Sequence, residues 1–129
     1  MTLVHGVDLV EVERIEAMLA DHGGRFLDRV FTPTERRDAD AGGPRRAEHY
    51  AARFAAKEAV FKALGTGWSG GIDWRDVGVV RLPGGQPTVC INGEAARVAQ
   101  TKGIASWALS LTHTSTHAMA SVVGSEALS

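Results

Sequence analysis

The chain has 129 residues, a formal net charge of -1 at neutral pH, 44% hydrophobic residues and 22% charged residues. These values are typical of a globular protein and predict a single domain over residues 1–129. They disfavour a protein whose main partner is nucleic acid, because such binding needs many contacts from Lys and Arg to phosphates. The lone Cys90 excludes an intramolecular disulfide and favours a reducing, cytoplasmic setting. We expect neither secretion nor a membrane span, since acidic residues interrupt the N-terminal region and no run of about 18 apolar residues occurs.

The first forty residues read as a strand, a helix and the start of a second helix. Residues 3–7 form a strand-like run that ends at Asp8, and apolar residues then recur at helical spacing until residues 22–24, His-Gly-Gly, interrupt them. Thr32 and Glu35, with a proline directly after the threonine, have the spacing of a capping box. A short second helix is therefore expected to follow Thr32.

A glycine-containing loop then precedes the longest helical pattern of the chain, which runs to about Leu64 and would span roughly 30 Å. The later segments predict two strands, a short helix and a hairpin, at residues 77–82, 87–92, 93–103 and 106–124. Period-2 alternation in the hairpin places His113 at the end of an apolar face. The pattern as a whole predicts an α+β fold, with a mostly antiparallel sheet packed against one long helix.

The long helix contains the stretch RFAAKEAVFKALGTG, from Arg53 to Gly67, which combines features of a buried helix with charge. Large apolar residues cover one side and alanines the opposite side, yet Lys57, Glu58 and Lys62 interrupt the pattern. Residues 45–62 hold five cations and two acids, in a chain that is nearly neutral overall. This local surplus favours a confined anionic ligand.

Glu58 and Lys62 are four residues apart and share a helix face, which leaves two interpretations open. In the first, they form an ordinary surface ion pair. In the second, the small neighbouring alanines let other backbone come close to the helix, so that the pair lies in a cleft. In a cleft, a phosphate with a bound cation would satisfy both signs of charge. Asp8 has the spacing to Glu11 of a capping box, yet with Glu58 it could also hold a hard cation such as Mg²⁺.

Two other kinds of site are disfavoured. The loop that begins with Gly65 follows a helix and lacks the Gly-Lys-Ser/Thr ending of a Walker A loop, so Gly65 is compatible with a simple helix C-cap. His113 and His117 are four residues apart, but a hairpin turn lies between them instead of one turn of a helix. This argues against a zinc site of the protease type.

Four motifs follow one another along the chain: Asp8-Leu9-Val10-Glu11 with Arg14-Ile15, Phe31-Thr32 with Glu35, Arg53 to Ala59 with Lys62 to Gly67, and Ser110 to Thr114. Together they resemble the holo-acyl carrier protein synthases, which are the small 4′-phosphopantetheinyl transferases. The resemblance covers about residues 4 to 124, and the motif of the long helix is its most specific part.

The resemblance implies the 4′-phosphopantetheinyl transferase fold and a Mg²⁺-dependent reaction. The phosphopantetheine arm of coenzyme A would pass to a serine of an apo-acyl carrier protein, with release of adenosine 3′,5′-bisphosphate. Asp8 and Glu58 would hold Mg²⁺, Glu58 would also orient or deprotonate the serine, directly or through water, and Lys62 would stabilise the departing phosphate oxygen. A catalytic cysteine is not needed, because phosphoryl transfer depends on positioning and charge stabilisation.

The resemblance also implies contacts to coenzyme A from Arg53, Lys57, Lys62, Gly65 and His113. The residues themselves leave alternatives open. His113 lies at the end of an apolar strand and could be a structural histidine. The aliphatic stem of Lys57 could instead cover the apolar side of the long helix while its ammonium reaches solvent.

The implied carrier-protein surface lies near the first helix, on basic and apolar residues that suit an acidic partner. Its residues are Arg14, Met18, Arg25, Phe26 and Arg29. Each is also compatible with a solvated charge or an ordinary core residue. Attraction between a basic surface and an acidic carrier would speed their encounter and make it sensitive to salt.

The small size of the chain, by the same resemblance, implies a homotrimer with active sites between subunits. The chain departs from the family pattern at two positions: Val4 replaces a glycine often found four residues before the metal-binding Asp, and His117 replaces a common aromatic residue after the His motif. These departures leave the loop geometry and the substrate preference open. A noncatalytic coenzyme A or nucleotide-binding module, and a nucleic-acid-binding protein that uses the cations of residues 45–62, remain alternative functions. The sequence does not distinguish fatty acid from polyketide synthesis, or coenzyme A from its acylated forms.

Overall fold

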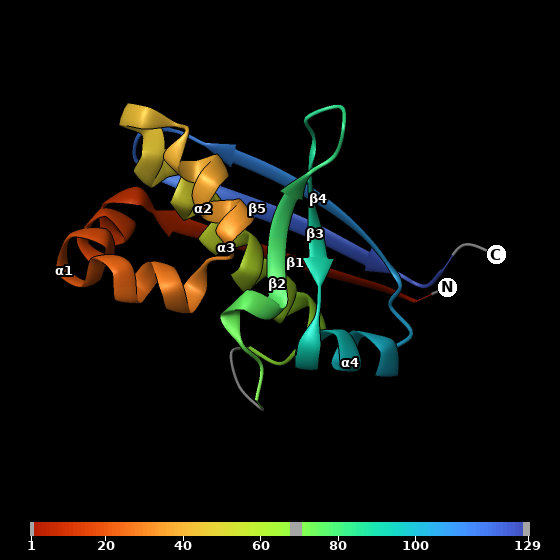
Figure 1. The fold of residues 1–129 in the computed structure, drawn as a ribbon. Helices are drawn as coiled ribbons and strands as arrows, with labels where there is room; N and C mark the ends of the chain where they lie inside the picture. The colour runs from red at the N-terminus through yellow and green to blue at the C-terminus, as the bar shows by residue number, and fades with distance from the viewer. Residues whose placement is uncertain (1, 68–70, 128–129) are drawn as a thin grey trace.

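The computed structural model describes residues 2–67 and 71–127. The elements in chain order are β1 (Leu3–Glu11), α1 (Val12–Val30), α2 (Pro33–Asp40), η1 (Gly43–Arg45), α3 (Arg46–Leu64), η2 (Trp74–Asp76), β2 (Val77–Arg81), β3 (Pro87–Ile91), α4 (Gly93–Thr101), β4 (Ser106–His113) and β5 (His117–Ser125) (Figure 1). This agrees with the elements expected from the sequence, apart from the end of β1, the interior of α1, the end of α2 at Asp40 and the short 3-10 helices η1 and η2. Residues 68–70 of the predicted glycine-rich loop lie outside the described residues. No helix in the described ranges is both long enough and apolar enough to span a bilayer.

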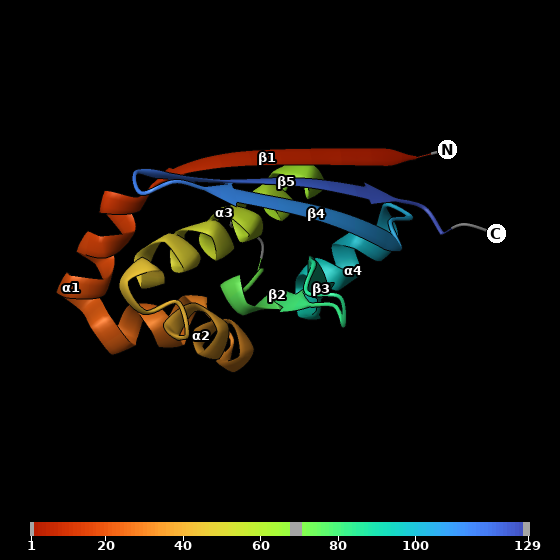
Figure 2. The same cartoon turned by 90° about the horizontal axis from the view of Figure 1, so that it is seen from above.

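The strands form two antiparallel sheets, one with the order β1-β5-β4 and one that pairs β2 with β3. The register places Asp8 opposite Ala120 and His113 opposite Ala118. Because side chains alternate along a strand, Asp8, Ala120 and Ala118 share the face of the three-stranded sheet that α3 covers. Figure 2 shows this sheet as one layer, α3 as the next, and α2 with the β2-β3 pair on the other side of the helix. The predicted α+β class is confirmed.

The central position of α3 explains its composition. The helix is covered by the sheet on one side and by α1, α2 and β2 on others, so most of its residues are buried, including Arg53 and Lys57. The closest approach is at Gly6 in β1, where an added Cβ would lie 1.8 Å from the carbonyl oxygen of Ala59. Only glycine therefore allows β1 and α3 to meet at this point.

The sequence prediction for the start of α1 is wrong in one respect. Asp8 is not a helix cap: β1 continues through Asp8 to Glu11, and the helix begins at Val12. Glu11 occupies the N-cap position without a side-chain hydrogen bond. Asp8 is therefore a strand residue whose carboxylate is free of any capping role.

The expected break at residues 22–24 is a kink rather than an end. α1 continues to Val30, but Gly23 has φ 45° and ψ -118°, outside the helical region. The capping box that starts α2 is confirmed, since the Thr32 hydroxyl accepts from the Glu35 amide and the Glu35 carboxylate accepts from the Thr32 amide.

Candidate active site

β1 and α3 bring Asp8, Glu58 and Lys62 together. The Lys62 ammonium donates to Asp8 Oδ1 at 2.9 Å and to the carbonyl oxygen of Val7 at 3.1 Å. The side chain of Asp8 is 14% exposed and that of Lys62 is 54% exposed, so the pair lies at the edge of the buried interior. The hydrogen bond to Asp8 also raises the pKa of Lys62, which keeps its ammonium charged.

Glu58 lies one helical turn before Lys62 and is half-buried. Burial, and after it the charge of Asp8, raises the pKa of Glu58, whereas Lys62 and Arg14 act in the opposite direction. Two carboxylates that face each other destabilise their shared ionised form unless positive charge lies between them. The arrangement therefore favours a cation, and it supports the cleft interpretation of the Glu58 and Lys62 pair.

Arg53 lies in the other half of α3 and is only 3% exposed. It donates to the carbonyl oxygen of His49 at 3.1 Å, whereas its Nε is buried without a hydrogen-bond partner among the described residues. Burial, followed by the nearby Arg81, lowers the pKa of Arg53. The pKa of His49 is lowered by burial, followed by Arg53 and His113, so this corner of the molecule is rich in cationic groups.

His113 is held at the same end of α3. Its Nδ1 is 2.8 Å from Glu48 Oε1, and its ring lies 5.2 Å from the ring of His49. A carboxylate that accepts from Nδ1–H fixes the ring and leaves Nε2 for another partner. Glu48 is thus a functional candidate that the sequence analysis missed, because 65 residues separate it from His113.

Lys57 is placed differently from the other predicted coenzyme A contacts. Its side chain and that of Glu35 are both 0% exposed, with Nζ 2.8 Å from Glu35 Oε1. The ammonium also donates to the carbonyl oxygens of Trp74 and Val77, so all of its protons are used inside the protein. The structure thus places Lys57 in the core, where it ties α3 to α2 and β2.

Gly65 takes the position that its helix-capping alternative predicts. It has φ 74° and its amide donates to the carbonyl oxygen of Lys62 at 3.0 Å, which ends α3 in a left-handed C-cap. The glycine therefore turns the chain directly after Lys62.

All the predicted carrier-binding residues line one hollow of about 500 Å³. It is lined by Arg14, Met18, His22, Arg25, Phe26, Arg29, Val30, Phe54 and Trp74. The guanidinium of Arg14 lies 5.6 Å from the ring centroid of Phe54, which stacks on Trp74 at 5.1 Å. We call this cavity the arginine-rimmed hollow. The charge of Arg14 also acts to lower the pKa of Glu58, so the Arg14 rim of the hollow lies on the side of Glu58.

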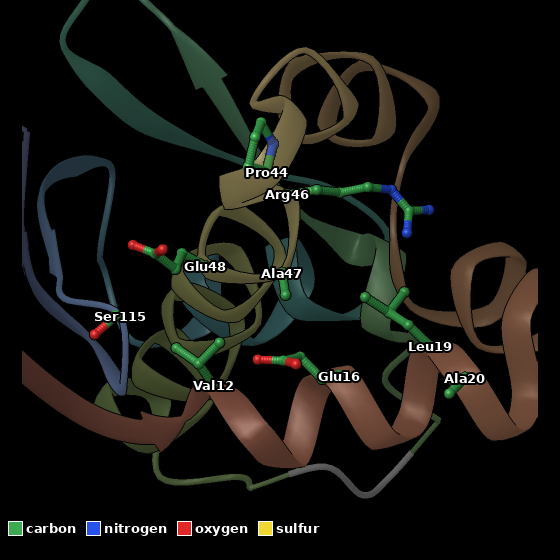
Figure 3. Close-up of a pocket in the computed structure, with 9 residues that line it drawn as sticks. All are labelled: Val12, Glu16, Leu19, Ala20, Pro44, Arg46, Ala47, Glu48 and Ser115. Carbon is green, nitrogen blue, oxygen red and sulfur yellow. The ribbon is translucent and has the colours of Figure 1, made fainter.

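A second hollow of about 440 Å³ lies between α1, the start of α3 and the β4-β5 loop (Figure 3). Glu16 and Glu48 contribute carboxylates to it and Arg46 a guanidinium. None of the predicted catalytic residues lines it. It borders the predicted site through Glu48, the partner of His113.

The profile of the 4′-phosphopantetheinyl transferase superfamily matches residues 5–120. The chain belongs to this superfamily. Among curated relatives of this transferase, holo-acyl carrier protein synthase of Desulforudis audaxviator is 55% identical over 122 residues, which cover 93% of this chain and 90% of the relative. The resemblance found in the sequence motifs is thereby confirmed.

Solved structures support the same assignment of the transferase fold. Holo-acyl carrier protein synthase of Neisseria meningitidis matches with a TM-score of 0.83 and 31% identity, over 95% of this chain and 98% of that one. The Bacillus anthracis synthase, solved in complex with coenzyme A (3′,5′-ADP), matches with a TM-score of 0.78 and 33% identity, over 96% of each chain. The predicted 4′-phosphopantetheinyl transferase fold is confirmed.

Proposed function

We propose that the protein transfers the 4′-phosphopantetheine arm of coenzyme A to a serine hydroxyl of an apo-acyl carrier protein. The main support for this proposal is that Asp8, Glu58 and Lys62 lie close together near the arginine-rimmed hollow, in a chain of the transferase superfamily. One chain thus presents groups suited to a diphosphate next to a surface suited to an acidic protein. The unpaired Cys90 fits action in a reducing cytoplasm, by a chain that forms a single domain.

The residues present fit a bound Mg²⁺. Asp8 and Glu58 supply carboxylate oxygens. Burial, followed by the charge of Asp8, raises the pKa of Glu58, so a nearby cation would favour its ionised form. Mg²⁺ is commonly held by one or two carboxylates together with substrate phosphates and water. Among the described residues, no group of three or more His, Cys, Asp or Glu side chains is placed to hold a metal ion. Bound there, Mg²⁺ would neutralise charge on the diphosphate.

The proposed transfer is a displacement at the phosphorus that bears the pantetheine arm. The serine oxygen forms a bond to this phosphorus, the bond to the bridging oxygen breaks, and adenosine 3′,5′-bisphosphate leaves with the bonding electrons. Glu58 accepts the serine proton, directly or through water. The Lys62 ammonium, fixed by Asp8 and the Val7 carbonyl, stabilises the departing phosphate oxygen.

Arg53 and His113 would bind further phosphates of coenzyme A. The buried, unpartnered Nε of Arg53 supports this role, because a buried donor without a partner is costly unless a ligand meets it. The Glu48 carboxylate would orient the His113 ring. Gly65 contributes by turning the chain after Lys62. Lys57 is left out of this set because its ammonium is enclosed by Glu35.

We further propose that three copies assemble through the outer face of the three-stranded sheet. This face carries several large apolar side chains that are exposed in the single chain: Leu3, Val7, Leu9, Met119 and Val123. Leu9 pairs directly with Met119, so the patch runs across β1 and β5. Val7 and Leu9 flank Asp8 in sequence, which would set the catalytic group next to a subunit boundary. The other half of each site would then come from Arg53 and His113 of a neighbouring copy.

The direct test is to incubate the protein with coenzyme A, Mg²⁺ and apo-acyl carrier proteins from fatty acid and polyketide synthesis, and to measure the carriers' intact masses. We expect one phosphopantetheine to be added, and none when the acceptor serine is replaced by alanine. Binding of coenzyme A without modification of any carrier would instead indicate a noncatalytic binding module.

A further inference from the structure

The kink in α1 depends on the backbone of one glycine. The angles of Gly23, φ 45° and ψ -118°, are close to those of the first central residue of a type II′ turn. Glycine adopts this conformation readily, whereas L-residues with a Cβ do not. A Cβ added at Gly23 would meet nothing within 4 Å, so space does not limit the position. Gly24 is equally open and does not have a positive φ. Alanine would fit sterically at both positions, but only at Gly23 would it have to adopt a backbone conformation that favours glycine. A comparison of the two substitutions therefore tests the backbone conformation alone.

The kink lets both halves of α1 reach one aromatic ring. In a straight helix, positions 14 and 26 would be about 18 Å apart along the axis. In the structure, the Arg14 guanidinium lies 5.6 Å from the Phe54 centroid and the Phe26 ring lies 6.4 Å from it. Figure 1 shows α1 as two segments that meet at an angle. The kink thereby turns what would be a flat stripe of side chains into a concave wall.

The arginine-rimmed hollow is made by this concave wall. Arg14 and Met18 come from the segment before Gly23, and Arg25, Phe26 and Arg29 come from the segment after it. The hollow combines three guanidinium groups with an apolar floor of Phe26, Phe54 and Trp74. Such a surface suits an acidic helix that carries a large apolar side chain.

We propose that Gly23 is a positioning residue for the carrier protein. It sets the angle between the halves of α1 so that cations on both sides of the kink contact one acidic helix of the carrier while its apolar side chain enters the hollow. This inference rests on the proposed function, because it takes the carrier to be the occupant of the hollow. It adds that recognition depends on a backbone conformation remote from the reacting atoms.

The test compares Gly23→Ala with Gly24→Ala. With Mg²⁺ and coenzyme A saturating, we expect Gly23→Ala to raise the KM for the carrier by about tenfold, because the L-residue favours straightening or twisting of the kink. The KM for coenzyme A should stay within about twofold of the wild type, since the phosphate-binding groups lie on other elements. Gly24→Ala should change neither value by more than about twofold.

Salt dependence supplies a readout that simple loss of stability would not change. If Arg25 and Arg29 move away from the carrier, the decrease of kcat/KM with ionic strength should be shallower in Gly23→Ala than in the wild type. For the same reason Arg25→Ala should weaken carrier binding less in the Gly23→Ala background than alone. An unchanged salt slope and additive effects would contradict the proposal.

A second variant covers the case in which Gly23→Ala does not fold. D-alanine, introduced at position 23 by peptide ligation, has the same composition and favours positive φ, so it should keep the wild-type KM for the carrier. Equal carrier KM values for the L- and D-alanine forms, or for Gly23→Ala and the wild type, would overturn the role of the kink. If the wild type modifies no carrier, the proposed function fails, whereas calorimetric binding of apo-carrier to the same variants still tests the kink. Absence of carrier binding to the wild type would overturn both.

Discussion

The side chain of Lys62 is exposed enough to be removed without disturbing the core, so a substitution there tests its role in turnover apart from folding. Its ammonium is partly exposed and bonded to Asp8 and to the Val7 carbonyl, where it can meet the departing phosphate. We expect Lys62→Ala to lower kcat by about 10²-fold or more, as when one charge-stabilising group is removed from an active site. Steady-state kinetics with the carrier assay measure this change. The matched control is Lys102→Ala, on an exposed residue after α4, which should leave kcat unchanged. Near-wild-type turnover of Lys62→Ala would remove the lysine from the mechanism.

Tyr50 offers a test of the packing around the start of α3. Burial, followed by the 2.8 Å hydrogen bond from its hydroxyl to Asp40, raises the pKa of Tyr50 to about 12. The pKa is about 10 in an unfolded chain, so the folded state favours the neutral phenol. This contribution to the free energy of unfolding is complete below pH 10 and is lost as the pH rises through about 12.

The measurement is direct because Tyr50 is the only tyrosine of the chain. Phenolate absorbance, followed while circular dichroism confirms that the protein is folded, should report a single transition near pH 12. A transition near pH 10 in the folded protein would mean that Tyr50 is solvated.

At the level of residues, the sequence predicted what depends on local spacing. Glu58 and Lys62 share a helix face because they are four residues apart, and Gly65 ends the helix as a C-cap glycine does. Contacts between distant segments were not predictable from spacing. Lys57 was assigned to coenzyme A although its partner, Glu35, is 22 positions earlier in another helix. A buried cation and a phosphate-binding cation look the same in a sequence until the partner is known.

At the level of elements, the distance between β1 and α3 determines whether the active site can form. Gly6 lies against the Ala59 carbonyl, and Asp8 follows two residues later on the same face of the strand. Gly6→Ala would force the strand and helix apart, because the new Cβ would lie only 1.8 Å from a backbone oxygen that cannot move alone. We expect a loss of about 1–3 kcal/mol in the free energy of unfolding, typical of overpacking, together with loss of turnover.

Urea denaturation and the carrier assay measure the two effects of Gly6→Ala. The control is Gly78→Ala in β2, where the added Cβ would meet only the Thr32 methyl at an ordinary 3.5 Å. If Gly6→Ala were as stable and as active as Gly78→Ala, the contact between β1 and α3 would not be needed to place Asp8.

Two of the differences between the predicted and observed elements concern α1, and both arise from local signals with two meanings. Asp8 and Glu11 have capping-box spacing, but the alternation of β1 continues through them because β5 supplies hydrogen-bonding partners as far as His117. The glycines at 23 and 24 do interrupt the helical backbone, as predicted, but a second helical segment follows directly, and both segments of α1 pack against Phe54. In each case tertiary contacts decided between two locally acceptable structures.

At the level of the whole molecule, one chain carries two groups of predicted site residues along different halves of α3. Asp8, Glu58 and Lys62 lie at the C-terminal half of α3, whereas Arg53 and His113 contact residues of its N-terminal half. The sequence indicated both groups through its motifs, but it contained no signal for their separation or for the exposed apolar face of the sheet. A trimer with sites between subunits would join the two groups across a boundary.

Subunit mixing tests this assembly. Asp8→Ala and His113→Ala should each be inactive as pure trimers. When the two variants are coexpressed with different tags and purified through both, each mixed trimer should contain one intact site, giving about one third of the wild-type turnover. Copurification of both tags without any recovered activity would show that each site is built within one chain.

Asp8 and Glu58 are proposed to hold a divalent ion together on the diphosphate of coenzyme A. The most direct measurement is binding of Mn²⁺, as a paramagnetic substitute for Mg²⁺, followed by electron paramagnetic resonance with and without coenzyme A. Coenzyme A should strengthen Mn²⁺ binding to the wild type, and Asp8→Asn or Glu58→Gln should abolish this enhancement. Equal enhancement in the wild type and in both variants would show that these carboxylates do not hold the ion.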